Sequence, residues 1–319
     1  MTELIIDVHS HPLLSDSLTA LTSGDATPHI SSSMVPPWSV AEHLETMDQY
    51  GIGTCILSMT GLADILNGAS GRATARRLNE QLATLIADHP GRFGAFAVVP
   101  VDDADATNEE MAYALDVLKL DGVSASPHRG GVYLGEPVYD AWFEEMHRRA
   151  VTLFVHPAMP PYFDPFESRL NVSVLEFMFE TSRMVTGLVL SGRKARFDGV
   201  KIIAPHGGGT IPYLANRIAL ASQMPWAYRD GAGLGVPDVV AGLASFYYDV
   251  TASTSAAQLE ALRLLVPAER LLMGFDYPMM PSMTISPAIA GLEAYCGFDD
   301  EAKAKIRRSN ALELFPRFG

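Results

Sequence analysis

The sequence has few cysteines, a deficit of positive charge and no long hydrophobic run. Cys55 and Cys296 are its only cysteines and neither has a metal-binding or redox spacing, so a disulfide framework is excluded and we expect a reduced, cytoplasmic protein with buried thiols. Lys and Arg number 23 against 37 Asp and Glu, a net charge of −14, so nucleic acid is not expected as a partner. No apolar run approaches the roughly 18–20 residues of a membrane span, and the first residues read as a strand rather than a signal peptide.

The chain instead alternates short apolar segments with stretches of helical periodicity. Eight segments are predicted to be strands: Leu4–Val8, Thr54–Ser58, Phe93–Val99, Gly122–Ser124, Thr152–Val155, Lys201–Ala204, Phe246–Asp249 and Leu271–Gly274. Helices are predicted at Val40–Tyr50, Ala73–Asp88, Asn108–Leu118, Val138–Arg149, Val174–Ser191, Thr254–Leu265 and Asp300–Leu314. The pattern predicts an α/β protein: one (β/α)8 TIM-like barrel domain, somewhat distorted, over residues 1–319.

Two segments interrupt this alternation. Residues 12–38 follow the first predicted strand and residues 160–171 follow the fifth, and both are candidate lid insertions over the C-terminal face of the barrel. A third irregular stretch, Met224–Pro237, is a candidate substrate entrance or interface.

The residues at the ends of four predicted strands carry the chemistry, because the carboxyl ends of barrel strands converge on one face. The first strand runs into His9 and His11, whose side chains point to the same side of an extended segment. His156, His206 and Asp276 end three other strands. A lone His-x-His pair is often just hydrogen-bonded or solvated, but a third histidine and a carboxylate nearby would complete an open site for a divalent metal.

The other signals are weaker. His29 and His128 fall in predicted loops, and His128 is a possible substrate contact although a loop histidine is more often solvated. We interpret His89 and His147 as structural or surface residues. The three glycines after His206 lack the pattern of a nucleotide-binding loop, and no serine or cysteine nucleophile motif is present.

Four motifs, in this order, resemble the amidohydrolase superfamily (amidohydrolase-related family 2): His9-x-His11, Phe154–Pro157, Lys201–Arg217 and Gly274–Pro278. The similarity covers nearly the whole chain and is to the decarboxylase branch, which includes the aminocarboxymuconate-semialdehyde and γ-resorcylate decarboxylases. The spacing and length are nearest to the 6-methylsalicylate decarboxylase type.

The resemblance implies a metal centre. His9, His11, His156 and Asp276 would ligate one divalent ion, with zinc expected and manganese as the alternative. A single ion is expected because residues 122–126 lack the bridging lysine of two-metal relatives. His206 and Asp276 are the candidate catalytic acid/base residues, and the sequence leaves open which of them delivers a proton.

The resemblance also implies substrate contacts. Arg217 would bind a substrate carboxylate across a dimer interface, so a homodimer or higher homo-oligomer is expected. His43 occupies the place of a second carboxylate-binding arginine, which favours a substrate with one carboxylate. Phe275 is a candidate wall residue for a flat ring, although aromatic residues at such density are more often core.

The predicted function is therefore a metal-dependent, non-oxidative decarboxylase. Its substrate would be a small aromatic or unsaturated carboxylic acid, such as a hydroxybenzoate. The alternative is a metal-dependent hydrolase or hydratase that acts on a lactone, an amide or an unsaturated acid.

Overall fold

The computed structural model describes residues 4–15, 17, 35–59, 66–163 and 169–319. Eight parallel strands form one sheet in the order β1-β2-β3-β4-β7-β8-β9-β10. Their bounds are Ile5–Ser10 (β1), Ile52–Leu57 (β2), Phe93–Val98 (β3), Gly122–Ala125 (β4), Thr152–Val155 (β7), Lys201–Ala204 (β8), Tyr247–Asp249 (β9) and Leu271–Leu272 (β10). Each of the eight strands lies within two residues of its predicted bounds.

The segment after β10 returns to β1 and closes the sheet into a barrel. The Val8 N–H donates to the Met273 carbonyl at 3.0 Å, and the Asp276 N–H donates to the His9 carbonyl at 2.7 Å. The His11 N–H donates to the Tyr277 carbonyl at 2.7 Å. The predicted (β/α)8 barrel is thus confirmed, and its closure places the first and the last metal-binding candidates side by side.

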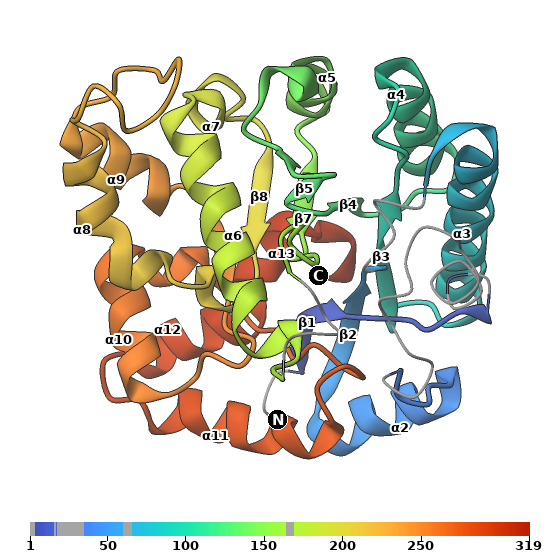
Figure 1. Ribbon diagram of the computed structural model, residues 1–319. Coiled ribbons are helices and arrows are strands. Elements are labelled where there is room, and N and C mark those ends of the chain that lie inside the picture. The colour runs from blue at the N-terminus through green and yellow to red at the C-terminus, as the bar shows by residue number, and fades with distance from the viewer. Residues whose placement is uncertain (1–3, 16, 18–34, 60–65, 164–168) are drawn as a thin grey trace.

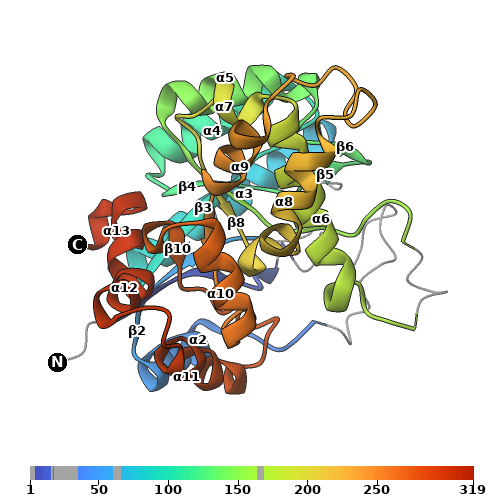
Figure 2. The ribbon, with the colours of Figure 1, turned by 90° about the vertical axis from the view of Figure 1, so that its left-hand side faces the viewer.

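Helices surround the strands (Figures 1 and 2). The α-helices are Val40–Tyr50 (α2), Gly68–Asp88 (α3), Ala104–Ala112 (α4), Asp140–Arg149 (α5), Val172–Leu190 (α6), Arg193–Arg196 (α7), Ile211–Ala221 (α8), Val236–Ala244 (α9), Ala256–Leu265 (α10), Ile285–Ala294 (α11), Asp300–Ala304 (α12) and Asn310–Leu314 (α13). Two π-helical turns, Tyr113–Val117 and Lys305–Ser309, extend α4 and α12. Both views show α2 and α11 side by side, as a closed barrel requires.

The sequence failed to predict one hairpin and four outer helices, α7, α8, α9 and α11. Helices α8, α9 and α11 each carry a proline in the first turn, at Pro212, Pro237 and Pro287. Proline suggests a loop in the sequence, but in a first helical turn its missing N–H costs no hydrogen bond. The hairpin, formed by His128–Arg129 (β5) and Val132–Tyr133 (β6), lies beyond β4.

The hydrophobic core has two layers. A large cluster lies between the strands and the helices, and a smaller one fills the barrel. Inside the barrel, Phe96 stacks on Phe154 with ring centroids 5.2 Å apart, and Phe315 packs edge-on against Phe96. Since Phe315 directly follows α13, the C-terminal segment contributes to the core inside the barrel.

Several predictions concern regions that the structure covers only in part. Residues 18–34 of the first candidate lid and 164–168 of the second lie outside the described residues, so both lids stay predictions. Cys55 is buried as predicted, but Cys296 is exposed, so the prediction of two buried thiols was wrong for Cys296. None of the helices in the described part of the chain is long and apolar enough to cross a bilayer.

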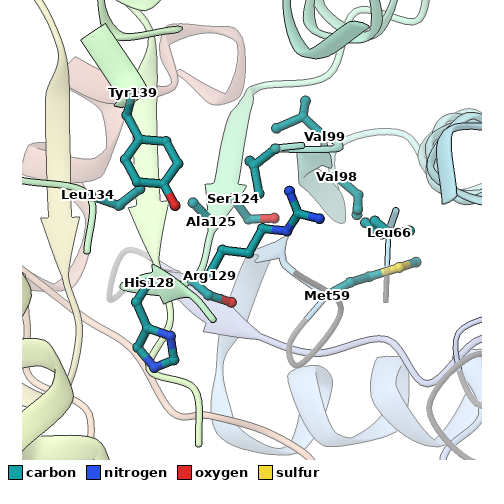
Figure 3. A pocket seen from close by; sticks show the side chains of 12 residues that line it. Met59, Leu66, Val98, Val99, Ser124, Ala125, His128, Arg129, Leu134 and Tyr139 are labelled. Carbon is teal, nitrogen blue, oxygen red and sulfur yellow. The ribbon is translucent and has the colours of Figure 1, made fainter. Parts of the chain in front are cut away.

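A cavity lies at the carboxyl ends of the neighbouring strands β3 and β4 (Figure 3). Val98, Ser124 and Ala125 contribute to it from these two strands, and Arg129 contributes from the hairpin. Its position on the carboxyl-end face of the barrel is the usual place for a substrate.

Candidate metal centre and active site

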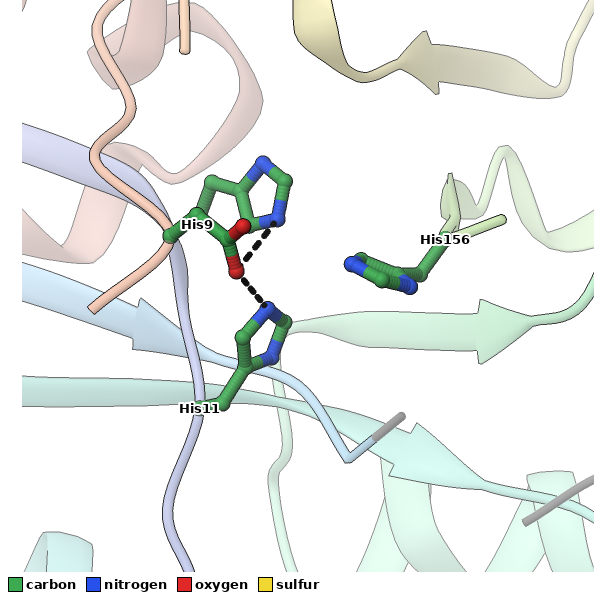
Figure 4. Close-up of side chains that lie close together, drawn as sticks. His9, His11 and His156 are labelled. Carbon is green, nitrogen blue, oxygen red and sulfur yellow. Dashed lines mark ion pairs between the residues drawn. The ribbon is translucent and has the colours of Figure 1, made fainter. Parts of the chain in front are cut away.

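Three histidines and one aspartate converge at the carboxyl end of the barrel (Figure 4). His9 lies in β1, His11 directly follows it, His156 follows β7 and Asp276 follows β10. One ligand atom from each of the four lies within 4.8 Å of the others. Oδ1 of Asp276 is 2.9 Å from Nε2 of His11 and 3.6 Å from Nε2 of His9. The structure therefore brings together the four residues predicted to be ligands.

Hydrogen bonds at Nδ1 orient all three imidazoles. Nδ1 of His9 is 2.9 Å from Oδ2 of Asp249, and Nδ1 of His11 is 2.9 Å from the Ser58 carbonyl. Nδ1 of His156 is 2.8 Å from the Pro157 carbonyl. These oxygens can only accept from a neutral histidine's N–H, so each Nδ1 carries the proton and each Nε2 presents a lone pair.

The ligand atoms have no hydrogen-bond partner of their own. Among the described residues, Nε2 of His9, His11 and His156 and Oδ1 of Asp276 are buried and lack one. Buried lone pairs that face one another are costly unless something positive lies between them. A cation satisfies all four atoms, and three nitrogens with one carboxylate oxygen are donors suited to zinc or manganese. The residues present thus fit one divalent metal ion.

The protonation states suit metal binding as well. Burial lowers the pKa of His9 and His156, which keeps both imidazoles neutral. Burial opposes ionisation of Asp276, but the nearby imidazoles of His11, His206 and His9 outweigh it and hold its pKa well below the usual range. Neutral imidazoles and an ionised carboxylate are the forms that ligate a metal.

Known proteins resemble this chain along nearly its whole length. The family model described as amidohydrolase matches residues 6–317. The chain belongs to the amidohydrolase family. It is 32% identical over 319 residues to a 6-methylsalicylic acid decarboxylase from Penicillium expansum, covering 98% of this chain and 96% of the relative.

Solved structures share the fold of this amidohydrolase. A 5-carboxyvanillate decarboxylase from Sphingomonas paucimobilis superposes with a TM-score of 0.85 at 20% identity, covering 98% of this chain and 99% of the other. A dihydroxybenzoic acid decarboxylase from Polaromonas sp. JS666, with bound manganese and the inhibitor 2-nitroresorcinol, gives a TM-score of 0.80 at 23% identity. It covers 98% of this chain and 97% of the other.

Asp249 supports the candidate site of this amidohydrolase, and the sequence analysis missed it. It is fully buried at the end of β9, where Oδ2 accepts from His9. Its Oδ1 accepts two backbone N–H groups at 3.0 Å, from His206 and Thr251. One carboxylate thus fixes both a ligand and the acid/base candidate. Its position as the last residue of a predicted strand could have identified Asp249 as a candidate site residue.

His206 lies beside Asp276 rather than within the ligand set. Its Nε2 is 3.6 Å from Oδ2 of Asp276, and its Nδ1 is buried without a hydrogen-bond partner among the described residues. Both residues have left-handed backbone conformations, with φ of +54° for His206 and +58° for Asp276. Such strain in non-glycine residues is typical of functional sites, where the surrounding structure holds it.

His43 lies in α2, almost completely buried near the metal centre. Nε1 of Trp38 donates to Nδ1 of His43 at 3.0 Å, so the proton of a neutral His43 is on Nε2. Burial lowers the pKa of His43 to about 3, with a further contribution from His11. His43 therefore offers an uncharged N–H donor, and its ring packs 4.9 Å from that of Tyr277.

Two predicted substrate contacts are not brought to this cluster. Arg217 lies on the exposed side of α8. Phe275 is 4% exposed and belongs to the core cluster between strands and helices. Phe275 therefore packs among core side chains rather than at the metal-binding cluster.

The view that His128 is a solvated loop residue was wrong. His128 is 2% exposed and lies in β5. Its Nε2 is 3.1 Å from Oε2 of Glu180, a fully buried residue of α6. Tyr133 of β6 also donates to both carboxylate oxygens of Glu180. The signal that was missed is the pair of glycines between His128 and Tyr133, which is typical of a tight hairpin.

Proposed function

We propose that this amidohydrolase is a metal-dependent decarboxylase of a hydroxybenzoate-type acid. The observation that carries the proposal is the cluster of unpartnered ligand atoms with the Asp276–His206 pair beside it. The relationship to a 6-methylsalicylic acid decarboxylase along 98% of the chain supports the reaction class.

The reaction replaces a carbon–carbon bond by a carbon–hydrogen bond. The ring carbon that bears the carboxylate accepts a proton, the bond to the carboxylate breaks, and CO₂ leaves with the ring rearomatised. A divalent ion held by His9, His11, His156 and Asp276 would act as a Lewis acid and a template for the oxygens of the acid. The chain itself must supply the proton.

We assign proton delivery to Asp276 and His206 as a pair. Oδ1 of Asp276 faces the histidine ligands, while Oδ2 faces Nε2 of His206 at 3.6 Å. His206 can hold the proton, and the ionised second oxygen of Asp276 can relay it to the substrate. Asp249 holds the backbone of His206 through its N–H and so keeps this pair in place.

His43 and Arg217 complete the proposal for substrate binding. His43 would donate from Nε2 to an uncharged or phenolic oxygen of the acid. Arg217, exposed on α8, would bind a carboxylate only in the site of a second protomer, so its proposed role requires a homodimer or a higher homo-oligomer. The cytoplasmic location stays a prediction.

The metal is proposed to be manganese ahead of zinc, which reverses the order expected from the sequence. The three-nitrogen, one-oxygen donor set accepts either ion. The preference rests on the manganese in the structurally similar dihydroxybenzoic acid decarboxylase. Elemental analysis of the purified protein and reconstitution of the apoprotein with each ion test it.

A substrate panel tests the reaction. Purified protein is supplied with manganese and incubated with 6-methylsalicylate, 2,6-dihydroxybenzoate and 5-carboxyvanillate while CO₂ release is followed. We expect CO₂ from at least one acid and none from the metal-free protein. Hydrolysis of lactones or amides without CO₂ release from any acid would replace this proposal with the hydrolase alternative.

A further inference from the structure

The β5–β6 hairpin presents two different faces. Gly130 and Gly131 have φ of +53° and +83° and form its two-residue turn, for which glycine is well suited. His128 pairs with Tyr133 and Arg129 pairs with Val132 in the antiparallel register. Because successive side chains alternate, Arg129 points to the side opposite His128.

The first face of the hairpin is anchored to the fold. His128 and Tyr133 both contact the buried carboxylate of Glu180, at 3.1 Å for the histidine and at 2.8 and 2.9 Å for the tyrosine hydroxyl. Arg183 also donates to Glu180 at 2.7 Å. These contacts hold the hairpin at two points, so the second face has a defined position.

Arg129 extends from the second face into the cavity at the ends of β3 and β4 (Figure 3). It is half-buried, and its guanidinium makes no hydrogen bond or ion pair with any described residue. By contrast, Arg183 is paired with Glu180 and Arg193 with Asp140. A partly desolvated cation with all its donors free favours an anionic ligand.

The cavity walls strengthen that preference. Met59, Leu66, Val98 and Leu134 are apolar lining residues, and they lower the local polarity around the guanidinium. About 30 Å³ of the cavity is accessible to water, which is room for roughly two oxygen-sized groups. The space thus suits an acidic group better than a whole aromatic ring.

The cavity also borders the metal centre. Ala125 lines the cavity, and its carbonyl accepts the His156 N–H at 3.0 Å. Met59, another lining residue, directly follows Ser58, whose carbonyl accepts from Nδ1 of His11. A molecule bound at the metal ligands therefore lies next to the wall from which Arg129 projects.

We propose that Arg129 is a carboxylate-binding residue of the active site and supplies, from within the same protomer, the positive charge that an aromatic acid requires. This inference rests on the proposed function for the identity of the acid. The shared chemistry is an aryl carboxylate held by the guanidinium fork, and the group has two possible sources. It is either the carboxylate that leaves as CO₂ or a second carboxylate elsewhere on the ring.

Kinetics separate the two sources. A second carboxylate keeps its charge throughout the reaction, so loss of Arg129 would raise KM and leave kcat unchanged. A leaving carboxylate loses its charge as CO₂ forms, so Arg129 would hold the ground state more tightly than the transition state. Its loss would then raise KM and also raise kcat.

The experiment measures binding as well as turnover. Manganese-loaded wild type, Arg129→Met and Arg129→Lys are titrated calorimetrically with salicylate, isophthalate and phenol. We expect Arg129→Met to weaken binding of an acid by about 10- to 100-fold, because charge-assisted hydrogen bonds are lost. Phenol binding should not change, and Arg129→Lys should recover part of the affinity. Arg263→Met is the matched control, since Arg263 is paired with Glu260 on the exposed side of α10.

The outcomes are distinct. Weaker binding of isophthalate alone indicates a second carboxylate, and weaker binding of both acids indicates the reacting one. Unchanged binding of both acids, with the melting temperature and manganese content of wild type, would overturn the assignment of Arg129 and leave the proposed decarboxylase intact. If Arg129→Met binds the acids more weakly but the wild type releases no CO₂, the assignment of Arg129 as a carboxylate-binding residue is supported and the proposed decarboxylase activity is refuted.

Discussion

Replacing Asp249 with asparagine should weaken metal binding although Asp249 is not a ligand. Oδ1 of Asp249 accepts the backbone N–H groups of His206 and Thr251, so an asparagine must keep its oxygen at that position. Its NH₂ group then faces Nδ1 of His9, which now accepts a hydrogen bond instead of donating one. The His9 proton moves to Nε2, the atom that would bind the metal.

The expected effect is moderate because one ligand of four is affected. Loss of a residue that orients a metal ligand typically lowers affinity about 10- to 100-fold, which corresponds to about 1.4–2.7 kcal/mol. In the opposite orientation of the asparagine amide, its NH₂ group would face the two backbone N–H groups. This buried contact between donors would lower the stability of the folded protein. Titration of the apoprotein with Mn²⁺, followed by elemental analysis after dialysis, measures the loss.

Asp7→Asn is the matched control. Asp7 is also buried next to His9, but its carboxylate accepts from the backbone N–H groups of His9 and Phe275, the Ser10 hydroxyl and the Cys55 thiol, and not from the His9 imidazole. Burial raises the pKa of Asp7 to about 7, so a neutral amide resembles one of its ordinary forms. If Asp249→Asn bound Mn²⁺ within about twofold of wild type, the assigned tautomer of His9 would be wrong.

The other predictions address the ligands, the proton donor and pH. The double variant His9→Ala/His11→Ala should purify without metal, and a full complement of manganese or zinc by elemental analysis would contradict the ligand assignment. His206→Asn should retain its metal while CO₂ release falls by on the order of 10²- to 10⁴-fold; near-normal turnover would remove His206 from the mechanism. Because burial lowers the pKa of His43 from 6.5 to about 3, the unfolded chain binds a proton below pH 6.5 that the folded protein does not. Above pH 6.5, His43 therefore does not lower the free energy of unfolding. As the pH falls from 6.5 toward 3, protonation of His43 in the unfolded chain lowers the free energy of unfolding progressively. Urea unfolding of the metal-free protein at pH 8 and pH 5 should show a loss about 2 kcal/mol larger for wild type than for His43→Gln, and equal losses in the two proteins would refute the assigned cause.

Much of the barrel could be predicted because its strands are marked locally. A parallel strand buried on both faces is a short apolar run, and eight such runs with helices between them define the fold class. The helices with a proline in the first turn were missed because the same residue also marks loops. The β5–β6 hairpin was missed because its strands contain only two residues each, too few to show an alternation.

The convergence of the four candidate metal ligands could be predicted for the same reason. His9 and His11 are two positions apart on an extended segment, and His156 and Asp276 follow strands whose ends must meet in a barrel. Phe275 lies in the core cluster between strands and helices, which its position in the sequence did not reveal. For Arg217, sequence position alone did not reveal that its helix faces outward.

The sequence by itself determined the strand count, the strand ends and the side of the chain on which each ligand lies, because these depend on neighbours within a few residues. Only the tertiary structure decided which atoms the ligands use and what supports them. Asp249 orients His9 from 240 positions away, and Glu180 anchors a hairpin from another element. Such contacts arise only when the barrel closes, since hydrogen-bond partners are selected by distance in space. The direction of Arg129 into the cavity was decided in the same way.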